Sequence, residues 1–172
     1  RAPLPPLPKA VKYLILSDIP TPWREPVYER VWRALAKDVL VVYFKGNEKR
    51  RLWSFKLGKH PKTILPGLTI TTGGPERFLN FGLFPLLVRH RPRVALLMTC
   101  IKDPSFWLAA ALLRLLGTKI ALLEDTWSGR DQGIGRMQKL ARRVVYRRFG
   151  DAFIGTSRQA LALFAHYNRS LR

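Results

Sequence analysis

The hydrophobic residues of this chain fall into two kinds of segment, which alternate along it. In the first kind several apolar residues follow one another directly, and many of them are β-branched. Runs of this kind are typical of strands that are buried on both faces of a sheet. Six runs predict strands: 11–17, 39–44, 68–72, 94–100, 119–125 and 151–157.

In the second kind of segment apolar residues recur every three or four positions, which predicts helices. The helical segments are 24–37, 76–90, 104–117, 133–150 and 157–167. Pro104 and Gly117 mark the two ends of one helix, Ser157 is a candidate N-cap, and Pro85 predicts a kink or break. The segment 133–150 has one apolar stripe, with arginines on the solvent face opposite. The stripe contains Ile134, Met137, Leu140, Ala141, Val144, Val145 and Phe149.

This alternation predicts the α/β class. We expect one Rossmann-like, doubly wound domain over 11–172, preceded by a proline-rich lead-in at 1–10, with a mostly parallel sheet of about six strands and helices on both faces. Right-handed crossovers bring the strand-to-helix loops to one edge of such a sheet. The strand ends at 18, 73, 100, 125 and 157 are therefore expected along one rim.

The segment 45–66 does not fit the alternation, because it has no convincing helical pattern. Its basic residues bracket aromatic ones, in the group Lys49, Arg50, Arg51, Trp53, Phe55 and Lys56. One interpretation is a solvated loop or β-excursion whose aromatic rings anchor it to the core. The other is a surface for anionic lipid headgroups or an acidic acceptor. The second interpretation also includes the region 76–93, where the sequence places aromatic residues beside arginines: Phe78, Phe81, Phe84, Arg89, Arg91 and Arg93.

The charge of the chain adds a preference for anionic partners. Lys and Arg number 31 against 11 Asp and Glu, a formal net charge of +20, which favours nucleic acid, anionic membranes or phosphorylated substrates. Cys100 stands alone, so no internal disulfide forms, and no Cys or His has metal-ligand spacing. The most apolar helical segment contains Arg114 and is too short to span a bilayer.

The expected rim lacks the motifs of several enzyme classes. The loop after the first strand has no glycine, so a nicotinamide or flavin cofactor is not expected, and there is no P-loop and no G-x-S-x-G. No histidine lies in the strand-end loops, which argues against a Ser-His-Asp hydrolase. The sequence thus predicts no cofactor and no metal in this chain.

Instead, the rim loops carry charged and polar side chains. Glu124 and Asp125 are the catalytic candidates, since paired acids at a strand end would supply a general base. Capping of the next helix is the alternative for such acids. The binding candidates are Asp18, Arg24, Thr99, Lys102, Thr126 and Trp127, the last of which would stack on a ligand or pack internally.

Four stretches of the chain resemble a known family. "SDIPTPWREPVYERV" is similar to an "N-x-P-x-P-Y-R-x-P" opening, and "RHRPRVALLM", "LLRLLGTKIALLEDTW" and "YRRFGDAFIGTSRQALALF" follow in the same order and spacing. Together they resemble the N-terminal half of glycosyltransferases of the two-Rossmann-domain (GT-B) type, especially the large retaining family 4. The similarity runs from about 11 to 167. Many relatives have a histidine near the fifth strand end, where this chain has Glu124 and Asp125.

The resemblance implies a function for this chain. It would be the acceptor-binding half of a nucleotide-sugar-dependent hexosyltransferase, inactive alone, with the donor held mainly by a second, C-terminal domain or subunit. Pro22, Trp23 and Arg24 would line the acceptor side of the cleft. The acceptor would be a sugar, lipid-linked or polysaccharide, at the cytoplasmic face of the membrane. The alternatives are a basic nucleic-acid-binding domain, for which no motif is found, and a non-catalytic subunit that docks a donor-binding partner.

Overall fold

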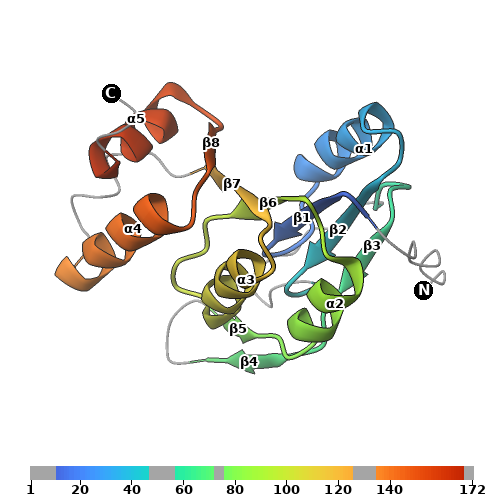
Figure 1. The fold of residues 1–172 in the computed structure, drawn as a ribbon, viewed down its shortest axis with the longest axis horizontal. Coiled ribbons are helices and arrows are strands. Elements are labelled where there is room, and N and C mark those ends of the chain that lie inside the picture. The colour runs from blue at the N-terminus through green and yellow to red at the C-terminus, as the bar shows by residue number, and fades with distance from the viewer. Residues whose placement is uncertain (1–10, 47–56, 72–75, 126–134, 169–172) are drawn as a thin grey trace.

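The structure of the protein is a computed structural model, which describes residues 11–46, 57–71, 76–125 and 135–168. Its centre is a six-stranded sheet in which every neighbouring pair of strands is parallel. In spatial order the strands are β3 (Lys62–Ile64), β2 (Val39–Tyr43), β1 (Tyr13–Ser17), β6 (Val94–Met98), β7 (Lys119–Glu124) and β8 (Ala152–Gly155). Figure 1 shows this sheet between its helices. The predicted α/β class and sheet size are confirmed.

Helices cover both faces of the sheet. The five helices of the described ranges are α1 (Arg24–Ala34), α2 (Leu83–His90), α3 (Pro104–Leu115), α4 (Arg136–Arg148) and α5 (Arg158–Tyr167). Tyr28 of α1 packs with Ile15 and Val41 in one apolar cluster, while α2 and α3 pack against the alternate side chains of the same strands. Within these ranges, no helix is long and apolar enough to cross a membrane.

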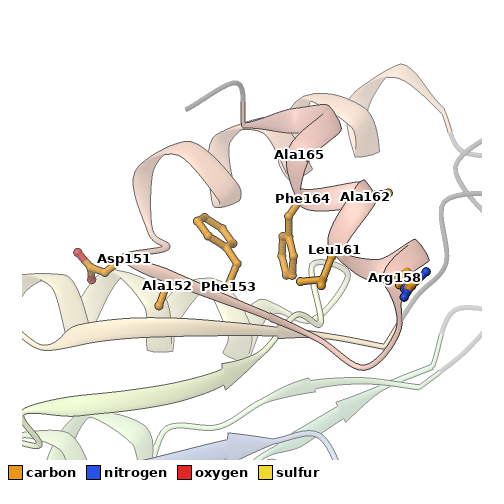
Figure 2. Close-up of a pocket in the computed structure, with 8 residues that line it drawn as sticks. All are labelled: Asp151, Ala152, Phe153, Arg158, Leu161, Ala162, Phe164 and Ala165. Atoms are coloured by element: carbon orange, nitrogen blue, oxygen red, sulfur yellow. The ribbon is translucent and has the colours of Figure 1, made fainter. Parts of the chain in front are cut away.

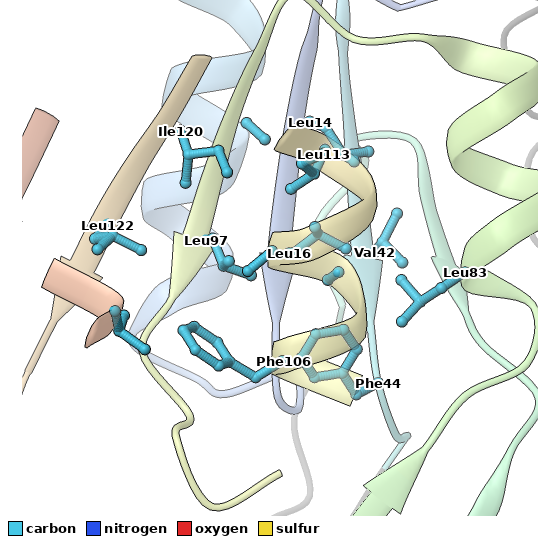
Figure 3. Close-up of a cluster of buried hydrophobic side chains, with 14 of the residues drawn as sticks. Leu14, Leu16, Val42, Phe44, Leu83, Leu97, Phe106, Leu113, Ile120 and Leu122 are labelled. Atoms are coloured by element: carbon cyan, nitrogen blue, oxygen red, sulfur yellow. The ribbon is translucent and has the colours of Figure 1, made fainter. Parts of the chain in front are cut away.

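The larger cluster lies between α3 and the central strands. Figure 3 shows Phe106 and Leu113 of α3 against Leu16 and Leu97, which come from β1 and β6. All four side chains are fully or almost fully removed from solvent. Because fully burying such a side chain contributes about 1.5–3 kcal/mol, this layer is the main source of stability that positions the strand ends.

The predicted helix ends agree with the structure. Pro104 occupies the first turn of α3, and Gly117 after that helix has φ of +73°, a left-handed conformation that glycine adopts without steric cost. The hydroxyl of Ser157 accepts a hydrogen bond from the Ala160 amide at 3.1 Å and so caps α5. These helix ends could be predicted from the sequence because each signal depends on residues within about one helical turn.

The third predicted strand forms, but its predicted place in the main parallel sheet was wrong. The segment 68–72 contributes β4 (Leu68–Ile70), which pairs antiparallel with β5 (Arg77–Leu79) in a separate two-stranded sheet. The edge position in the main sheet belongs to β3, within the segment that showed no clear pattern. The buried ammonium of Lys62 in β3 lies 3.4 Å from Glu25, an ion pair that allows a lysine where an apolar residue was expected. Residue 73 lies outside the described ranges.

The prediction of a helix with a kink or break over 76–90 holds only for the second half of that segment. This segment begins with β5, and α2 starts only at Leu83, so that Pro85 lies in the first turn, where it leaves no helical hydrogen bond unmade. Buried Asn80 forms the turn between them: its side-chain amide donates to the carbonyls of Phe44 and Leu65, at 2.8 and 3.2 Å. One polar side chain thereby fixes the small sheet to the end of β2.

The apolar stripe of α4 is divided between two environments. Val145 is fully buried, but Met137, Leu140 and Val144 are exposed. Buried Tyr146 takes the place on the core side that the stripe had been expected to fill. The predicted stripe is therefore only partly core-facing, and Ile134 lies outside the described ranges.

Candidate functional site

The strand order reverses between β1 and β6, which makes this point the switch of the sheet. From β1 the chain moves to β2 on one side, whereas from β6 it moves to β7 on the other. In open α/β sheets, ligands bind in the crevice outside the carboxyl ends of the strands at such a point. Asp18 follows β1, Thr99 follows β6, and Asp125 follows β7. The structure thus brings three sequence-predicted site residues to neighbouring strand ends.

Arg24 connects two of these strand ends. Its guanidinium donates to Asp18 Oδ1 at 2.7 Å and to Asp125 Oδ2 at 2.6 Å. The side chains of Arg24 and Asp18 are only 13% and 18% exposed, whereas that of Asp125 is 50% exposed. Burial lowers the pKa of Arg24, but the two carboxylates outweigh it and raise that pKa above its ordinary value. The guanidinium stays charged, and part of the Asp125 carboxylate faces solvent.

The proline-rich turn places Arg24 at the start of α1. Buried Thr21 accepts from the amides of Arg24 and Glu25 through its carbonyl, at 3.2 and 3.1 Å, and its hydroxyl accepts from the Arg24 amide at 3.3 Å. Because Thr21 satisfies the first amides of α1, the helix begins at a fixed point. Pro22 and Trp23 lie exposed on the same turn. Thr21 was not singled out in the sequence, because Glu25 follows it by four residues, whereas a capping box needs three.

The loop after β6 contributes less to the rim than its composition suggested. The hydroxyl of Thr99 donates to the carbonyl of Leu123 at 2.9 Å, so it ties β6 to β7. Lys102 is exposed on the following turn. Burial, together with the carboxylates of Asp18 and Asp103, raises the pKa of the Cys100 thiol. A raised pKa disfavours the thiolate, which is the nucleophilic form of a cysteine.

Glu124 and Asp125 are adjacent in sequence but have different surroundings. Glu124 is buried, and its carboxylate accepts from the Tyr146 hydroxyl of α4 at 2.6 Å. Asp125 turns to the rim and meets Arg24. Two successive residues at a strand end point to opposite sides, so the carboxylates of Glu124 and Asp125 do not face the same site. Thr126 and Trp127 lie outside the described ranges.

Some of the residues predicted to contact a membrane lie outside the described ranges, and the structure describes the others. Lys49, Arg50, Arg51, Trp53, Phe55 and Lys56 lie outside the described ranges. Of the additional aromatic residues, Phe78 is buried in the core, whereas Phe81 and Phe84 are well exposed at the start of α2. The latter two have the exposure that a membrane-contacting ring requires.

A second polar cluster lies beneath the start of α1 and was missed in the sequence. Buried Glu25 accepts from the Gly58 amide at 2.7 Å and from the Tyr43 hydroxyl. Burial and this carboxylate raise the pKa of Tyr43. Lys62 also approaches Glu25, and His60 lies 3.8 Å from it. The cluster anchors β3 and the preceding turn to α1, beside Arg24; its members are far apart in sequence, so no local pattern marks them.

A hollow of about 590 Å³ lies away from these strand ends, between β8 and α5. Figure 2 shows that Phe153 and Leu161 form its apolar wall, with Arg158 and Asp151 at its ends. The carboxylate of Asp151 accepts from the Ile120 amide at 2.8 Å, so one of its oxygens is already hydrogen-bonded to β7. None of the site residues predicted from the sequence lines this hollow.

Comparisons of the chain with models of known protein families, with curated proteins and with solved structures find no match. The chemistry that these strand ends can support must therefore be argued from their own geometry. A guanidinium held between two carboxylates offers donors and acceptors on one rigid support, and the half-exposed carboxylate of Asp125 is the acceptor that a ligand would reach.

Proposed function

We propose that the chain is the acceptor-binding half of a nucleotide-sugar-dependent glycosyltransferase. The observation that carries the proposal is the bridge from Asp18 through Arg24 to Asp125 at the switch of the sheet. The bridge fixes the proline-rich turn against the end of β7 and leaves Trp23 exposed beside it. An aromatic ring next to fixed hydrogen-bonding groups suits a sugar, which has an apolar face and hydroxyls around its edge.

The chemistry assigned to the crevice is acceptor binding and proton transfer. Asp125 would accept the proton of the acceptor hydroxyl, as general bases in such positions do. Arg24 would orient that carboxylate and hold it at the strand end. Glu124, which binds Tyr146, would instead keep α4 against β7. The resemblance assigns the nucleotide-sugar to a second Rossmann domain, which another stretch of chain or another subunit would provide.

We place the protein at the cytoplasmic face of the membrane, where it would act on a lipid-linked or polysaccharide acceptor. The net charge of +20 favours an anionic surface. Exposed Phe81 and Phe84 lie at the start of α2, and Arg89, Arg91 and Arg93 lie in its last turn and just after it. Rings that enter the interface beside cations that meet headgroups are typical of peripheral membrane proteins.

Saturation-transfer NMR on the 172-residue chain tests the acceptor role. The ligands are methyl α-glucoside, methyl α-galactoside and methyl α-mannoside. At least one should receive saturation from the protein, and Asp125→Asn and Arg24→Gln should each weaken its binding about tenfold or more. Loss of a hydrogen bond to a charged group costs about 1.5–3 kcal/mol, which corresponds to that range.

Asp38→Asn is the matched control, because Asp38 forms an ion pair with Lys12 at the amino ends of the strands, opposite the candidate site. Its saccharide signals should equal those of the unmodified chain. If no saccharide binds, or if Asp125→Asn and Asp38→Asn behave alike, the acceptor role is wrong. Binding of single-stranded DNA that depends on Arg24, without saccharide binding, would favour the nucleic-acid alternative.

A further inference from the structure

Helix α4 carries an apolar stripe on its outer side. The exposed fractions of Met137, Leu140 and Val144 are 77%, 52% and 38%. With about 3.6 residues per turn, positions three and four apart lie one above another on the same side of a helix. These three residues therefore form a continuous strip of apolar surface along the helix.

The stripe is not the side by which α4 packs on the domain. That side is occupied by Val145 and Tyr146, both fully buried. The ring of Tyr146 contacts the rings of Phe164 and Tyr167 in α5, with centroids 4.8 and 5.8 Å apart. Figure 1 shows α4 at one end of the molecule, beside α5. The helix thus buries one apolar side in the domain and presents a second one outward.

Basic residues border the exposed stripe. At about 100° of rotation per residue, Arg136, Arg143 and Arg147 lie within about 60° of Leu140 around the helix, whereas Lys139 lies about 100° from it, on the side of Tyr146. The sequence of the helix, RMQKLARRVVYRR, contains no acidic residue. The outward side of α4 is therefore partly apolar and partly cationic.

We infer that α4 lies along an anionic lipid bilayer, with Met137, Leu140 and Val144 in the interface and the flanking cations at the headgroups. Charge complementarity selects the bilayer as the occupant, because the cations need an anionic partner and the stripe needs an apolar one, and an anionic membrane supplies both. A nucleic-acid surface would use the arginines but would leave three apolar side chains in water. This inference extends the membrane part of the proposed function to a defined element.

Vesicle co-sedimentation of the 172-residue chain tests the inference. Vesicles of phosphatidylcholine alone are compared with vesicles containing 30% phosphatidylglycerol, at low and high salt. The chain should bind the anionic vesicles preferentially, and salt should weaken binding because it screens the exposed charges. The double variant Met137→Ser, Leu140→Ser should reduce the partition coefficient about tenfold or more. In Arg136→Gln, Arg143→Gln, each lost cation should reduce it about fivefold.

The controls are Leu115→Ser and Arg30→Gln. Leu115 is a strongly exposed apolar residue at the end of α3, and Arg30 is an exposed cation on α1. Both should leave the partition coefficient unchanged. All four altered α4 positions are exposed, so circular dichroism should show the unmodified fold in every variant.

Three results would overturn the inference: equal binding to neutral and anionic vesicles, unchanged binding in both α4 variants, or equal losses in the α4 and control variants. Single-stranded DNA binding that falls in the arginine variant, while vesicle binding does not, would assign the helix to nucleic acid instead. Saccharide binding is measured separately in the same variants, because Arg24 and Asp125 are unchanged in them. Loss of the membrane role and loss of the acceptor role are therefore distinguishable.

Discussion

The two ion pairs of Arg24 should contribute unequally to stability, although their distances are nearly the same. The nitrogen–oxygen distances are 2.7 Å to Asp18 and 2.6 Å to Asp125, but Asp18 is largely buried and Asp125 is half exposed. A hydrogen bond to a largely buried charged group contributes about 1.5–3 kcal/mol. An ion pair with an exposed partner contributes about 0.2–1 kcal/mol. Burial rather than distance is expected to decide which pair is stronger.

Double-mutant cycles measure this difference directly. The variants are Arg24→Gln, Asp18→Asn, Asp125→Asn and the two doubles that contain Arg24→Gln. The coupling free energy should be about 2 kcal/mol for Arg24 with Asp18 and below about 1 kcal/mol for Arg24 with Asp125. Arg24→Gln alone should lower the free energy of unfolding by about 2–3 kcal/mol, because it also leaves the Asp18 carboxylate without its cation.

Urea denaturation at pH 7 is a suitable assay. With a denaturant dependence of about 2 kcal/mol per molar urea, Arg24→Gln should move the unfolding midpoint down by about 1 M or somewhat more. The dependence itself should stay constant, so that the free energies are comparable. A coupling with Asp125 equal to or larger than that with Asp18 would refute the reasoning, since it would mean that solvent exposure does not weaken the outer pair.

Three further outcomes are expected. His60 should titrate below its ordinary pKa of 6.5, because burial and the Lys62 ammonium outweigh the effect of the Glu25 and Glu29 carboxylates. The unfolded chain then binds more protons than the folded one, so the free energy of unfolding falls as pH drops below about 6.5, by at most about 1.4 kcal/mol per pH unit. An NMR titration midpoint for His60 at or above 6.5 would contradict this. Asp151→Asn should cost about 1–2 kcal/mol of unfolding free energy in urea, since its carboxylate accepts from Ile120 and Arg114. A change of less than about 0.5 kcal/mol, the scale of ordinary surface substitutions, would be evidence against that role. Calorimetry should give dissociation constants weaker than about 1 mM for UDP-glucose and GDP-mannose, with no sugar transfer by this chain; tight donor binding would disagree with the assignment of the donor to a second domain.

The central strands and most helix ends were predictable because their signals are local. Val39–Tyr43 is a continuous apolar run in which three of the five residues are valine, and the structure buries all of it. The edge strand at Lys62–Ile64 gave no such signal, because its lysine is stabilised by Glu25, far away along the chain. Conversely, Leu68 and Ile70 have a strong strand pattern and yet lie exposed in the small antiparallel sheet. Sequence periodicity reports the presence of a strand but not its partner.

The candidate site was predictable as far as topology dictates it. The rule that parallel strands end at one rim placed Asp18 and Asp125 near each other, and the structure joins them through Arg24. The same rule does not say which way a side chain points at a strand end, so the burial of Glu124 against Tyr146 was not predictable. Nor could an apolar residue on α4 be assigned to the core or to the outer face before Tyr146 was known to occupy the core side.

Chemical-shift mapping of the ¹⁵N-labelled chain with the binding saccharide tests the acceptor role most directly. Asp18, Thr99 and Asp125 come from three different strand ends, and Arg24 is the first residue of α1. The account predicts that saccharide shifts the backbone amides of these four residues together and saturably. In Arg24→Gln the same shifts should need about tenfold more saccharide or more, while the rest of the spectrum stays that of the folded chain. Saturable shifts confined to the hollow between β8 and α5, around Phe153 and Leu161, would place the ligand elsewhere and contradict the account.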